Sequence, residues 1–417
     1  MTYGLIGEHL GHSWSPLLHN LVSGLDYELA EVSRRELGRW LRETPFRGLN
    51  VTIPYKKSVI PYLDSLSPDA RETGAVNTII RLEDGSLKGY NTDVYGAAAL
   101  MRLSKAPIDG RRVLILGRGG AAMAFAKAAR DLGAASIRFA VRTPKTADEL
   151  PLSSPESFKD SEILANATPV GMFPEITCKP LDISYLPKLD VVLDCIYNPL
   201  SSSLVLDARS LGITALGGLR MLVAQAVKTQ ELFTGESFGE DIISRTHAAI
   251  GQRLANIVLI GMPYSGKTTV GRLLASSMGR EFVDTDTMVE AAAGRSIPEI
   301  FAREGEKTFR TREREAVRGL APRTGLVIAS GGGTVLSDDN LKSLRHNGIL
   351  CLLDRPIDKM QPSSDRPLAS DFASIERLAL ERAGAYRNAA DFCIANDSTP
   401  EDAAARIQQA IKLHFQS

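Results

Sequence analysis

The stretch GMPYSGKTTVGRLLA, residues 261–275, decides the fold of the second part of the chain. It fits the pattern G-x-x-x-x-G-K followed by Ser or Thr, comes directly after the apolar run NIVLI at 256–260, and leads into a helical pattern. A strand, a glycine-rich loop and a helix in this order form a phosphate-binding loop whose backbone N–H groups surround the phosphates. The stretch therefore predicts an α/β nucleotide-binding domain.

Individual residues of this loop have separate expected roles. Lys267 is expected to reach the β- and γ-phosphate oxygens, and Thr268 to bind Mg²⁺. The next apolar run ends in Asp284 and Asp286, where an acid suits a metal-bound water or an acceptor hydroxyl. The residues expected to bind the nucleotide are Gly261, Ser265, Gly266, Lys267, Thr268 and Thr269, with Thr268 and Asp284 at the metal.

A second glycine-rich turn lies in RRVLILGRGGAAMAFAKAARDLG, residues 111–133, and also reads as strand, turn and helix. It fits G-x-G-x-x-G/A, in which the helix N-terminus receives a dinucleotide pyrophosphate. The following run, 136–141, leads to Arg142 and Lys145 instead of the acid that would hold the ribose hydroxyls of NAD. These cations favour the 2′-phosphate of NADP. The alternative is a structural turn with a solvated basic end.

Length and composition limit the class of protein. A chain of 417 residues predicts two or three domains. Its 49 basic and 49 acidic residues give no net charge, which argues against a nucleic-acid or membrane partner. The first residues lack the pattern of a signal peptide, and no apolar run approaches the roughly 18 residues of a spanning helix. Four scattered cysteines are typical of the reducing cytoplasm, where we expect this protein. No feature of the sequence defines an oligomeric state.

Short apolar runs alternate with amphipathic segments along the whole chain, which is the signature of an α/β fold. A last helix is expected at 239–255, and a new strand opens at Asn256, so we place a domain boundary there. The expected buried strands are YGLIG, GLNVTI, RVLILG, SIRFAV, VVLDCIY, NIVLIG, GLVIAS and GILCLLD.

The first hundred residues contain polar groups suited to a polyhydroxylated small molecule. Lys56 and Asp93 make a plausible proton-transfer pair if both face one apolar-walled cleft. Taken singly, Asp93 is equally suited to cap the following helix, Asn77 to serve a turn, and Lys56 to be a surface lysine. Two hydroxyls, those of Ser13 and Ser15, are expected on one side of an extended segment.

The ordered segments HSWSP, NVTIPYKK, GAVNTI, NTDVYG, LGRGGAA, VRT, NATPVGM, DCIYNP and GGLRMLVAQA make the first 254 residues resemble shikimate dehydrogenase. The resemblance implies a substrate-binding domain at 1–97, completed by helices in 218–254, and a Rossmann NADP-binding domain at 98–217. It implies NADPH-dependent reduction of 3-dehydroshikimate to shikimate, with Lys56 and Asp93 as the catalytic pair.

The resemblance also implies the residues around each ligand. Arg118 and Val141 depart from the family, which usually has Ala and Asn at these positions; Arg118 either adds a pyrophosphate contact or crowds it. The implied substrate-binding residues are Ser13, Ser15, Asn50, Thr52, Asn77, Tyr197 and Gln225, and the implied cofactor-binding residues are Gly117, Gly119, Gly120, Ala121, Arg142, Thr143, Lys145, Thr168, Gly218 and Met221.

From Asn256 onward the segments GMPYSGKTT, VDTD, FAREGEKTFRTRE, ASGGGTV, DRPLA and ERAGAY resemble shikimate kinase. This implies a P-loop kinase domain at 255–417 that uses ATP and Mg²⁺ to phosphorylate the 3-hydroxyl of shikimate. Asp286 would orient that hydroxyl, Asp284 would hold Mg²⁺ through water, and Arg366 would come from a closing lid. Shikimate would be bound by Asp286, Arg310, Gly331, Gly332, Gly333 and Arg382, with Glu313 steadying Arg310.

The two resemblances agree on one metabolite, because the first enzyme would make shikimate and the second would phosphorylate it. They are consecutive steps of aromatic amino-acid precursor synthesis. The lid at 352–370 looks short, and Lys359 stands where the family has an arginine; the segment IANDSTP at 394–400 only loosely matches the adenine contact. The alternative is a quinate/shikimate dehydrogenase that uses NAD, fused to a weakly active or regulatory kinase-like domain.

Overall fold

The computed structural model describes residues 1–11, 13–361 and 371–415, and the structural statements below refer to these residues. The chain divides into two compact units, Met1–Ile250 and Gly251–Ser417, and each is described by itself.

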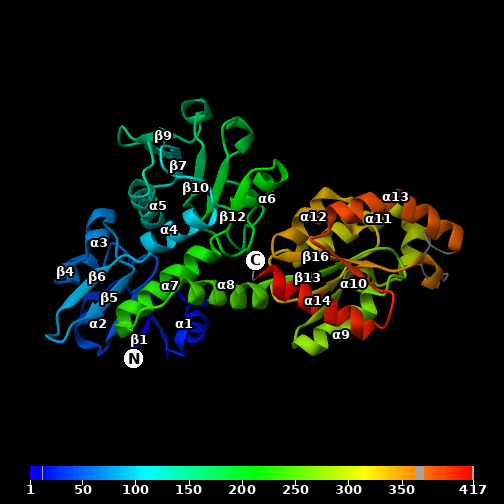
Figure 1. The fold of residues 1–417 in the computed structure, drawn as a ribbon, viewed down its shortest axis with the longest axis horizontal. Helices are drawn as coiled ribbons and strands as arrows, with labels where there is room; N and C mark the ends of the chain where they lie inside the picture. Colours follow the sequence, from blue (N-terminus) through cyan, green and yellow to red (C-terminus); the bar gives the residue numbers. More distant parts are fainter. Residues whose placement is uncertain (12, 362–370, 416–417) are drawn as a thin grey trace. The chain divides into compact units, whose positions relative to one another are not determined.

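The first unit contains two sheets (Figure 1). In the first sheet, of order β2-β1-β3-β5-β6-β4, β1 pairs in parallel with β2 and β3, while β5 is antiparallel to β3 and β6. The strands are β1 (Tyr3–Gly7), β2 (Glu28–Glu31), β3 (Gly48–Val51), β4 (Ser65–Leu66), β5 (Thr78–Arg81) and β6 (Leu87–Tyr90). The helices of this region are α1 (Ser15–Ser23), α2 (Leu37–Glu43), α3 (Pro68–Thr73) and the 3₁₀ turn η1 (Ile60–Tyr62).

The second sheet is parallel throughout, with the order β12-β11-β10-β7-β8-β9. Successive residues of β7 enter different cores, since Val113 and Ile115 pack in one hydrophobic cluster and Leu114 and Leu116 in another. This burial of both faces explains why its strands are continuous apolar runs. The elements are β7 (Arg112–Leu116), α5 (Gly120–Asp131), β8 (Ser136–Val141), β9 (Glu149–Pro151), η2 (Pro155–Phe158), β10 (Ile163–Asn166), η3 (Ile183–Tyr185), β11 (Val191–Asp194), α6 (Ser203–Ser210) and β12 (Thr214–Leu216).

Helices α4 (Asp93–Leu103) and α7 (Leu219–Thr234) pack against each other and link the two sheets of the first unit. The chain passes from the first sheet to the second through α4 and returns through α7, which also contacts β5. At its far end α7 places Phe233 on Tyr3 of β1, with ring centroids 4.9 Å apart. Helix α8 (Glu240–Leu254) follows.

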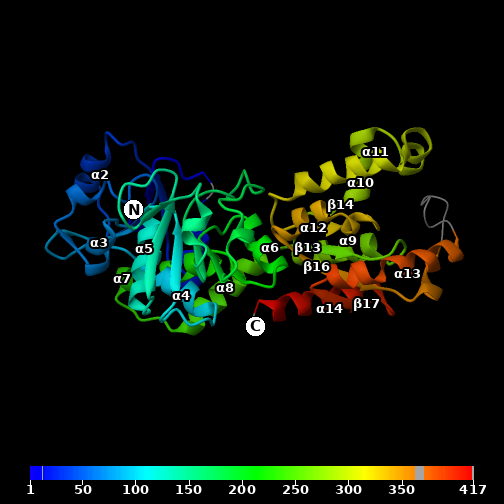
Figure 2. The ribbon, with the colours of Figure 1, turned by 90° about the horizontal axis from the view of Figure 1, so that it is seen from above.

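The second unit has one parallel five-stranded sheet, of order β14-β15-β13-β16-β17 (Figure 2). The strands are β13 (Asn256–Ile260), β14 (Phe282–Asp284), β15 (Val327–Ala329), β16 (Gly348–Asp354) and β17 (Phe392–Ala395). The helices are α9 (Lys267–Met278), α10 (Thr285–Ala293), α11 (Ile297–Leu320), η4 (Thr334–Leu336), α12 (Asp338–Arg345), η5 (Ile357–Lys359), α13 (Phe372–Ala389) and α14 (Pro400–His414).

The α/β fold predicted from the sequence is confirmed, and the expected strands overlap, in chain order, with β1, β3, β7, β8, β11, β13, β15 and β16. One local expectation was wrong. Ser13 and Ser15 do not share an extended segment, because α1 begins at Ser15. Pro16 explains the early start, since its fixed φ and missing N–H suit the first turn of a helix.

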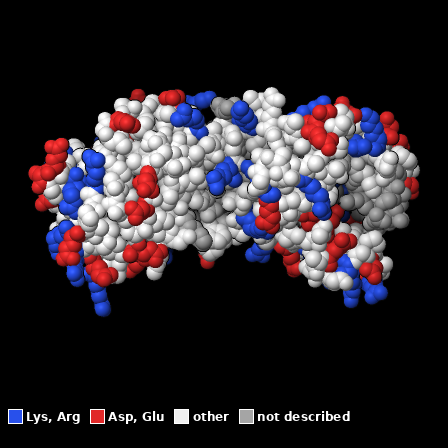
Figure 3. All heavy atoms as spheres, turned by 90° about the horizontal axis from the view of Figure 1, so that it is seen from below, with Lys and Arg blue, Asp and Glu red and all other residues white. Residues whose placement is uncertain are grey.

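Charges of both signs are interspersed over the face shown in Figure 3, in keeping with the zero net charge of the chain. Across the described ranges, no helix is both long and apolar enough to cross a membrane.

Two candidate active sites

In the first unit, Lys56, just beyond β3, meets Asp93, the first residue of α4. Lys56 Nζ donates to Asp93 Oδ2 at 2.6 Å, and Asn77 Nδ2 donates to Asp93 Oδ1 at 2.9 Å. The Asp93 N–H donates to Asn91 Oδ1 at 3.1 Å, so the residue is fixed on three sides. The N-cap of α4 is Thr92, and Asp93 is the first residue of the helix. Two charge-assisted bonds thus hold the Asp93 carboxylate, which is only 10% exposed, beside the Lys56 amine.

Behind this pair lies a hydroxyl cluster that sequence reasoning missed. Thr229 Oγ1 on α7 lies 3.1 Å from Thr78 Oγ1 and 3.0 Å from Thr92 Oγ1. Thr92 Oγ1 also donates to Gln225 Oε1 at 3.4 Å. Gln225 and Thr229 are four residues apart on one helix and therefore share a face, which is the signal that the sequence did contain.

The predicted substrate residue Asn50 belongs to the same cluster. Its Nδ2 donates to Thr78 Oγ1 at 3.1 Å and Thr229 Oγ1 at 3.2 Å, while its Oδ1 accepts from the Tyr27 hydroxyl at 2.7 Å. The amide of Asn50 is thus bonded within the wall of the site, where it holds β3 and β5 to α7.

Other predicted substrate residues gather around Tyr197, which follows β11. The Tyr197 ring lies 5.2 Å from that of Trp14, between Ser13 and Ser15, and burial raises the pKa of Tyr197. Ser13 Oγ donates to Ser15 Oγ at 3.1 Å. Among the described residues, no hydrogen bond joins these two serines to Lys56 or Asp93. Thr52 is half-buried, and its N–H donates to the carbonyl of Ile6 at 3.1 Å.

The predicted dinucleotide turn lies between β7 and α5, next to the Lys56 pair. A Cβ placed on Gly120 would lie 3.6 Å from Lys56 Cδ, whereas one on Gly119 would have no heavy atom within 4 Å. The N-terminus of α5 therefore has free space beside Gly119, its N-cap residue, and carries no side-chain cap bond. Exposed residues follow β8 at Arg142, Thr143 and Lys145. This cradle with a basic end fits a dinucleotide carrying a 2′-phosphate.

A buried carboxylate, Asp194 at the end of β11, fixes the remaining wall of this turn and was not predicted. Its Oδ1 accepts from Asn166 Nδ2 at 3.0 Å and from the Ile196 N–H at 2.9 Å, and its Oδ2 accepts from Ser202 Oγ at 2.5 Å. Burial raises the pKa of Asp194 to about 6, against the effect of these bonds. Asn166 in turn accepts from the hydroxyl of Thr168, at 2.7 Å.

Two predicted cofactor residues, Gly218 and Met221, lie at the start of α7, where Gly218 packs against the backbone of Asp194 and Cys195. Gly218 is the N-cap of α7 and its N–H donates to the carbonyl of Ile196 at 2.7 Å. Met221 is buried in the core shared by α4, α5 and β7. The structure therefore brings the glycine turn, Thr168, Gly218 and the Lys56 pair to one region of the first unit.

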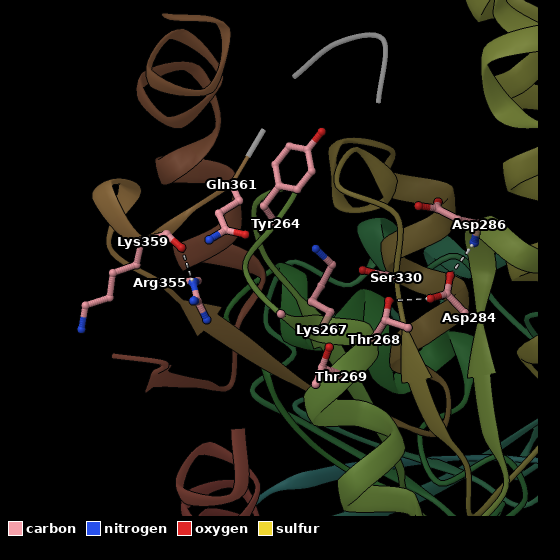
Figure 4. A pocket seen from close by; sticks show the side chains of 11 residues that line it. Tyr264, Lys267, Thr268, Thr269, Asp284, Asp286, Ser330, Arg355, Lys359 and Gln361 are labelled. Atoms are coloured by element: carbon pink, nitrogen blue, oxygen red, sulfur yellow. Dashed lines mark hydrogen bonds between the residues drawn. The ribbon is translucent and has the colours of Figure 1, made fainter. Parts of the chain in front are cut away.

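In the second unit, a cavity of about 400 Å³ lies over the phosphate-binding loop between β13 and α9 (Figure 4). Lys267 Nζ donates to the carbonyls of Gly261 at 2.9 Å and Met262 at 2.8 Å. The lining residues are Tyr264, Gly266, Lys267, Thr268, Thr269, Asp284, Asp286, Ser330, Arg355, Lys359 and Gln361.

Thr268 and Asp284 are the residues that fit a magnesium ion. Thr268 Oγ1 donates to Asp284 Oδ2 at 2.8 Å, and Asp284 Oδ1 accepts from the N–H of Asp286 at 3.0 Å. No group of three or more His, Cys, Asp and Glu side chains that could hold a metal occurs within the described ranges. Mg²⁺ needs no such cage, because it is usually bound by one or two carboxylates together with substrate phosphates and water.

Asn396, directly after β17, supports the phosphate-binding loop and was not predicted as a site residue. Its Nδ2 donates to the carbonyl of Ser265 at 2.7 Å, and its side chain is buried. Gly266, next to Ser265, has φ +89°, and a Cβ there would lie 2.7 Å from Asn396 Nδ2. The loop therefore requires glycine at position 266.

The predicted acceptor residues surround the three glycines that follow β15. A Cβ on Gly331 would lie 2.6 Å from Asp286 Oδ1 and 2.8 Å from Glu313 Oε1, so both carboxylates closely approach the backbone here. Arg310 Nη1 lies 3.0 Å from Glu313 Oε2. Burial lowers the pKa of Arg310, but the carboxylates of Glu313 and Glu306 outweigh it and raise the pKa above its usual value.

Arg382 on α13 donates from Nη1 to the carbonyl of Gly332 at 3.0 Å, and the hydroxyl of Tyr386 donates to the same oxygen. Asp286, Arg310 and Arg382 thus converge on the glycine turn from three different helices, α10, α11 and α13. Two guanidinium groups, those of Arg310 and Arg382, and two carboxylates, those of Asp286 and Glu313, therefore surround a single backbone turn.

The lid residues are only partly described. Arg366 lies outside the described residues. Lys359 lines the cavity, but its Nζ donates to the carbonyl of Asp397 at 2.5 Å and points away from Lys267 (Figure 4). Arg355, which the sequence prediction missed, also lines the cavity and donates from Nε to the carbonyl of Lys359 at 3.0 Å.

Comparison with known proteins gives a match for each unit. Residues 5–79 match the family model of the shikimate dehydrogenase substrate binding domain, and residues 263–412 match that of shikimate kinase. The shikimate dehydrogenase (NADP(+)) of Caldanaerobacter subterraneus subsp. tengcongensis is 36% identical over 265 residues, which is 58% of this chain and 94% of that protein. That of Clostridium beijerinckii is 36% identical over 247 residues, 55% of this chain and 91% of the relative.

Two solved structures show the same likeness. Shikimate 5-dehydrogenase from Thermus thermophilus, in complex with NADP(H) and shikimate, has a TM-score of 0.52 and 30% identity, covering 60% of this chain and 99% of that one. A chorismate mutase/shikimate 5-dehydrogenase fusion protein from Clostridium acetobutylicum has a TM-score of 0.57 and 33% identity, covering 60% and 96%.

Gly266→Ala should abolish measurable binding of Mg·ATP to the full chain, because the new Cβ meets the Asn396 amide and distorts the loop. Gly279→Ala is the matched control, since Gly279 also has positive φ (+62°) but no heavy atom within 4 Å of a Cβ. Isothermal titration calorimetry with Mg·ATP measures both variants. Equal affinities for the two variants would contradict this reading of the loop.

Proposed function

Because the chain belongs to the shikimate dehydrogenase family and carries a shikimate kinase domain over residues 263–412, we propose that it catalyses two consecutive reactions of the shikimate pathway. The first is NADPH-dependent reduction of 3-dehydroshikimate to shikimate, and the second is transfer of the γ-phosphoryl group of ATP to the 3-hydroxyl of shikimate. One observation supports the proposal: each nucleotide-binding turn lies beside ionisable side chains, Lys56 and Asp93 in one unit and Asp286 in the other.

In the reduction, the ammonium of Lys56 would donate a proton to the oxygen that develops negative charge on the former ketone. When bound, NADPH supplies the hydride. Asp93 accepts from Lys56 and Asn77, so its carboxylate holds the amine of the lysine in a fixed position. The hydroxyl cluster behind it keeps α7, and with it Gln225, at a fixed distance from the pair. General acid assistance of this kind typically contributes about 10²–10⁴-fold to the rate.

In the phosphorylation, Asp286 would accept the proton of the attacking hydroxyl or orient it. Arg310 and Arg382 would hold the carboxylate of shikimate, since the guanidinium fork matches two carboxylate oxygens. The side chain of Glu313 is 2% exposed, and its ion pair with Arg310 fixes the orientation of the guanidinium. Lys267 would bind the β- and γ-phosphate oxygens. Thr268 and Asp284 would hold Mg²⁺, which supplies charge neutralisation at the phosphates when bound.

NADP is the cofactor favoured by both the relatives and the site. The curated relatives are NADP(+) enzymes, and Arg142 and Lys145 follow β8 where an NAD enzyme has an acid. The alternative of an NAD-dependent quinate/shikimate dehydrogenase is not favoured. We propose the division into 1–97 with helices in 218–254, 98–217 and 255–417.

We further propose that the enzyme acts in the cytoplasm on small molecules, without a nucleic-acid or membrane partner. All four cysteines are free thiols, as expected in a reducing compartment. The mixed surface charge in Figure 3 supports a small-molecule enzyme, since it offers no single-sign patch on the face shown.

Product analysis by mass spectrometry tests the two activities together. With 3-dehydroshikimate, NADPH, ATP and Mg²⁺, the native chain should form shikimate 3-phosphate. Lys267→Ala should stop at shikimate, because it removes the cation at the phosphates, and Lys56→Ala should lower the reduction about 10²–10⁴-fold. Exposed Lys57 and Lys412 provide matched controls as alanine variants. Neither shikimate nor shikimate 3-phosphate from the native chain would refute the first activity, and shikimate without its 3-phosphate would refute the second.

Arg382→Ala should raise the KM of the kinase reaction for shikimate about 10- to 100-fold, which is the loss expected for a charge-assisted pair of bonds. Reduction of 3-dehydroshikimate by the same protein should not change. Arg377→Ala, an exposed arginine on the same helix, is the control. Steady-state assays with shikimate and with 3-dehydroshikimate measure both reactions. An unchanged KM for shikimate in Arg382→Ala would remove this residue from the acceptor site.

A further inference from the structure

Arg118 stands inside the dinucleotide-binding glycine turn, between Gly117 and Gly119, and its side chain turns toward β8 and β9. Its Nη1 lies 3.0 Å from Asp148 Oδ2 and its Nε lies 3.2 Å from Glu149 Oε1. Its guanidinium lies over the ring of Phe139, 3.8 Å from the centroid. These two carboxylates and the ring hold the Arg118 guanidinium in place, so it does not point toward a bound pyrophosphate.

Glu149 connects this arginine to the basic segment that follows β8. The Glu149 side chain is 7% exposed, and its Oε2 accepts from the N–H of Lys145 at 2.5 Å. Asp148 accepts from Thr146 Oγ1 at 2.6 Å. The turn and the segment 142–147 are therefore joined through two carboxylates, with Arg118 as the side chain that reaches across from the turn.

The position of these acids bears on the choice of dinucleotide. A carboxylate near the end of the second strand of a Rossmann sheet binds the ribose hydroxyls of NAD, whereas a 2′-phosphate there needs cations. Asp148 and Glu149 lie beside the segment that carries Arg142 and Lys145, so both would repel a 2′-phosphate if they were not paired. The Thr146 hydroxyl first and then Arg118 lower the pKa of Asp148, so this carboxyl stays charged and needs its partner.

We propose that Arg118 is a specificity-determining residue that favours binding of NADP over NAD. Its guanidinium pairs with the carboxylates of Asp148 and Glu149, so that they do not repel the 2′-phosphate. The same ion pairs hold the segment 142–147 next to the glycine turn. The inference rests on the proposed dehydrogenase function and adds to it a residue that determines the choice of dinucleotide. Arg118 itself need not touch the cofactor, because its effect passes through the charge and the position of its neighbours.

Direct binding of NADP⁺ and of NAD⁺ to the full chain, measured by isothermal titration calorimetry without substrate, tests this role. Arg118→Ala should raise the Kd for NADP⁺ about 3- to 5-fold, the size expected for a partly exposed ion pair, and leave the Kd for NAD⁺ unchanged or lower. Arg118→Lys should fall between, since it keeps the charge and loses the fork. Arg130→Ala, which removes an exposed arginine of helix α5, the helix that follows the turn, should change neither Kd.

A second variant separates sequestration from other causes. Adding Glu149→Gln to Arg118→Ala removes a carboxylate that has lost its arginine partner and should restore part of the preference for NADP⁺. Equal weakening of both dinucleotides in Arg118→Ala would show a contact with the shared pyrophosphate and overturn the inference. No change in either Kd, or no recovery in the double variant, would overturn it as well.

Failure of this inference is distinguishable from failure of the proposed function. A native chain that reduces 3-dehydroshikimate with NADPH while Arg118→Ala keeps its full preference for NADP⁺ refutes only the role of Arg118. A native chain that binds neither dinucleotide refutes both.

Discussion

Both candidate sites depend on a helix that begins at a glycine. Helix α5 has Gly119 as its N-cap and α9 has Gly266, and neither helix start carries a side-chain cap bond. The first N–H groups of any helix lack partners within the helix and need an acceptor. A phosphate provides that acceptor and also meets the positive end of the helix dipole. In each unit, a parallel sheet places such a helix directly after a buried strand, which is β7 in the first unit and β13 in the second. The fold itself therefore creates the two nucleotide-binding turns.

The groups proposed for chemistry are held by bonds that do not involve a ligand. Asp93 is fixed by Lys56, Asn77 and Asn91, and Asp284 is fixed by Thr268 and the N–H of Asp286. Buried polar groups must be paired to avoid a large desolvation penalty, and pairing them also sets their orientation. Pre-set groups of this kind need little rearrangement when charge develops during a reaction. The same logic applies to Arg310 and Glu313 at the acceptor side.

The parts of each site that the sequence predicts are those that a local pattern encodes. Lys267 and Thr268 belong to one loop, and Gly119 and Gly120 to one turn, so their geometry follows from spacing alone. Thr229, Asp194 and Asn396 were missed because they reach their sites through tertiary packing, from α7, β11 and the end of β17. The prediction that Ser13 and Ser15 share an extended segment was wrong because Pro16 favours the start of a helix at Ser15. Arg366 stays a prediction from the sequence.

One isotope measurement tests the central claim that a single chain carries both reactions. The full chain is incubated with 3-dehydroshikimate, ATP, Mg²⁺ and NADPH deuterated at C4, and the products are analysed by mass spectrometry and NMR. The account predicts shikimate 3-phosphate that carries one deuterium at the carbon of the former ketone. Deuterated shikimate without phosphate would contradict it. So would the absence of deuterium from every product, even if shikimate supplied in a parallel incubation is phosphorylated.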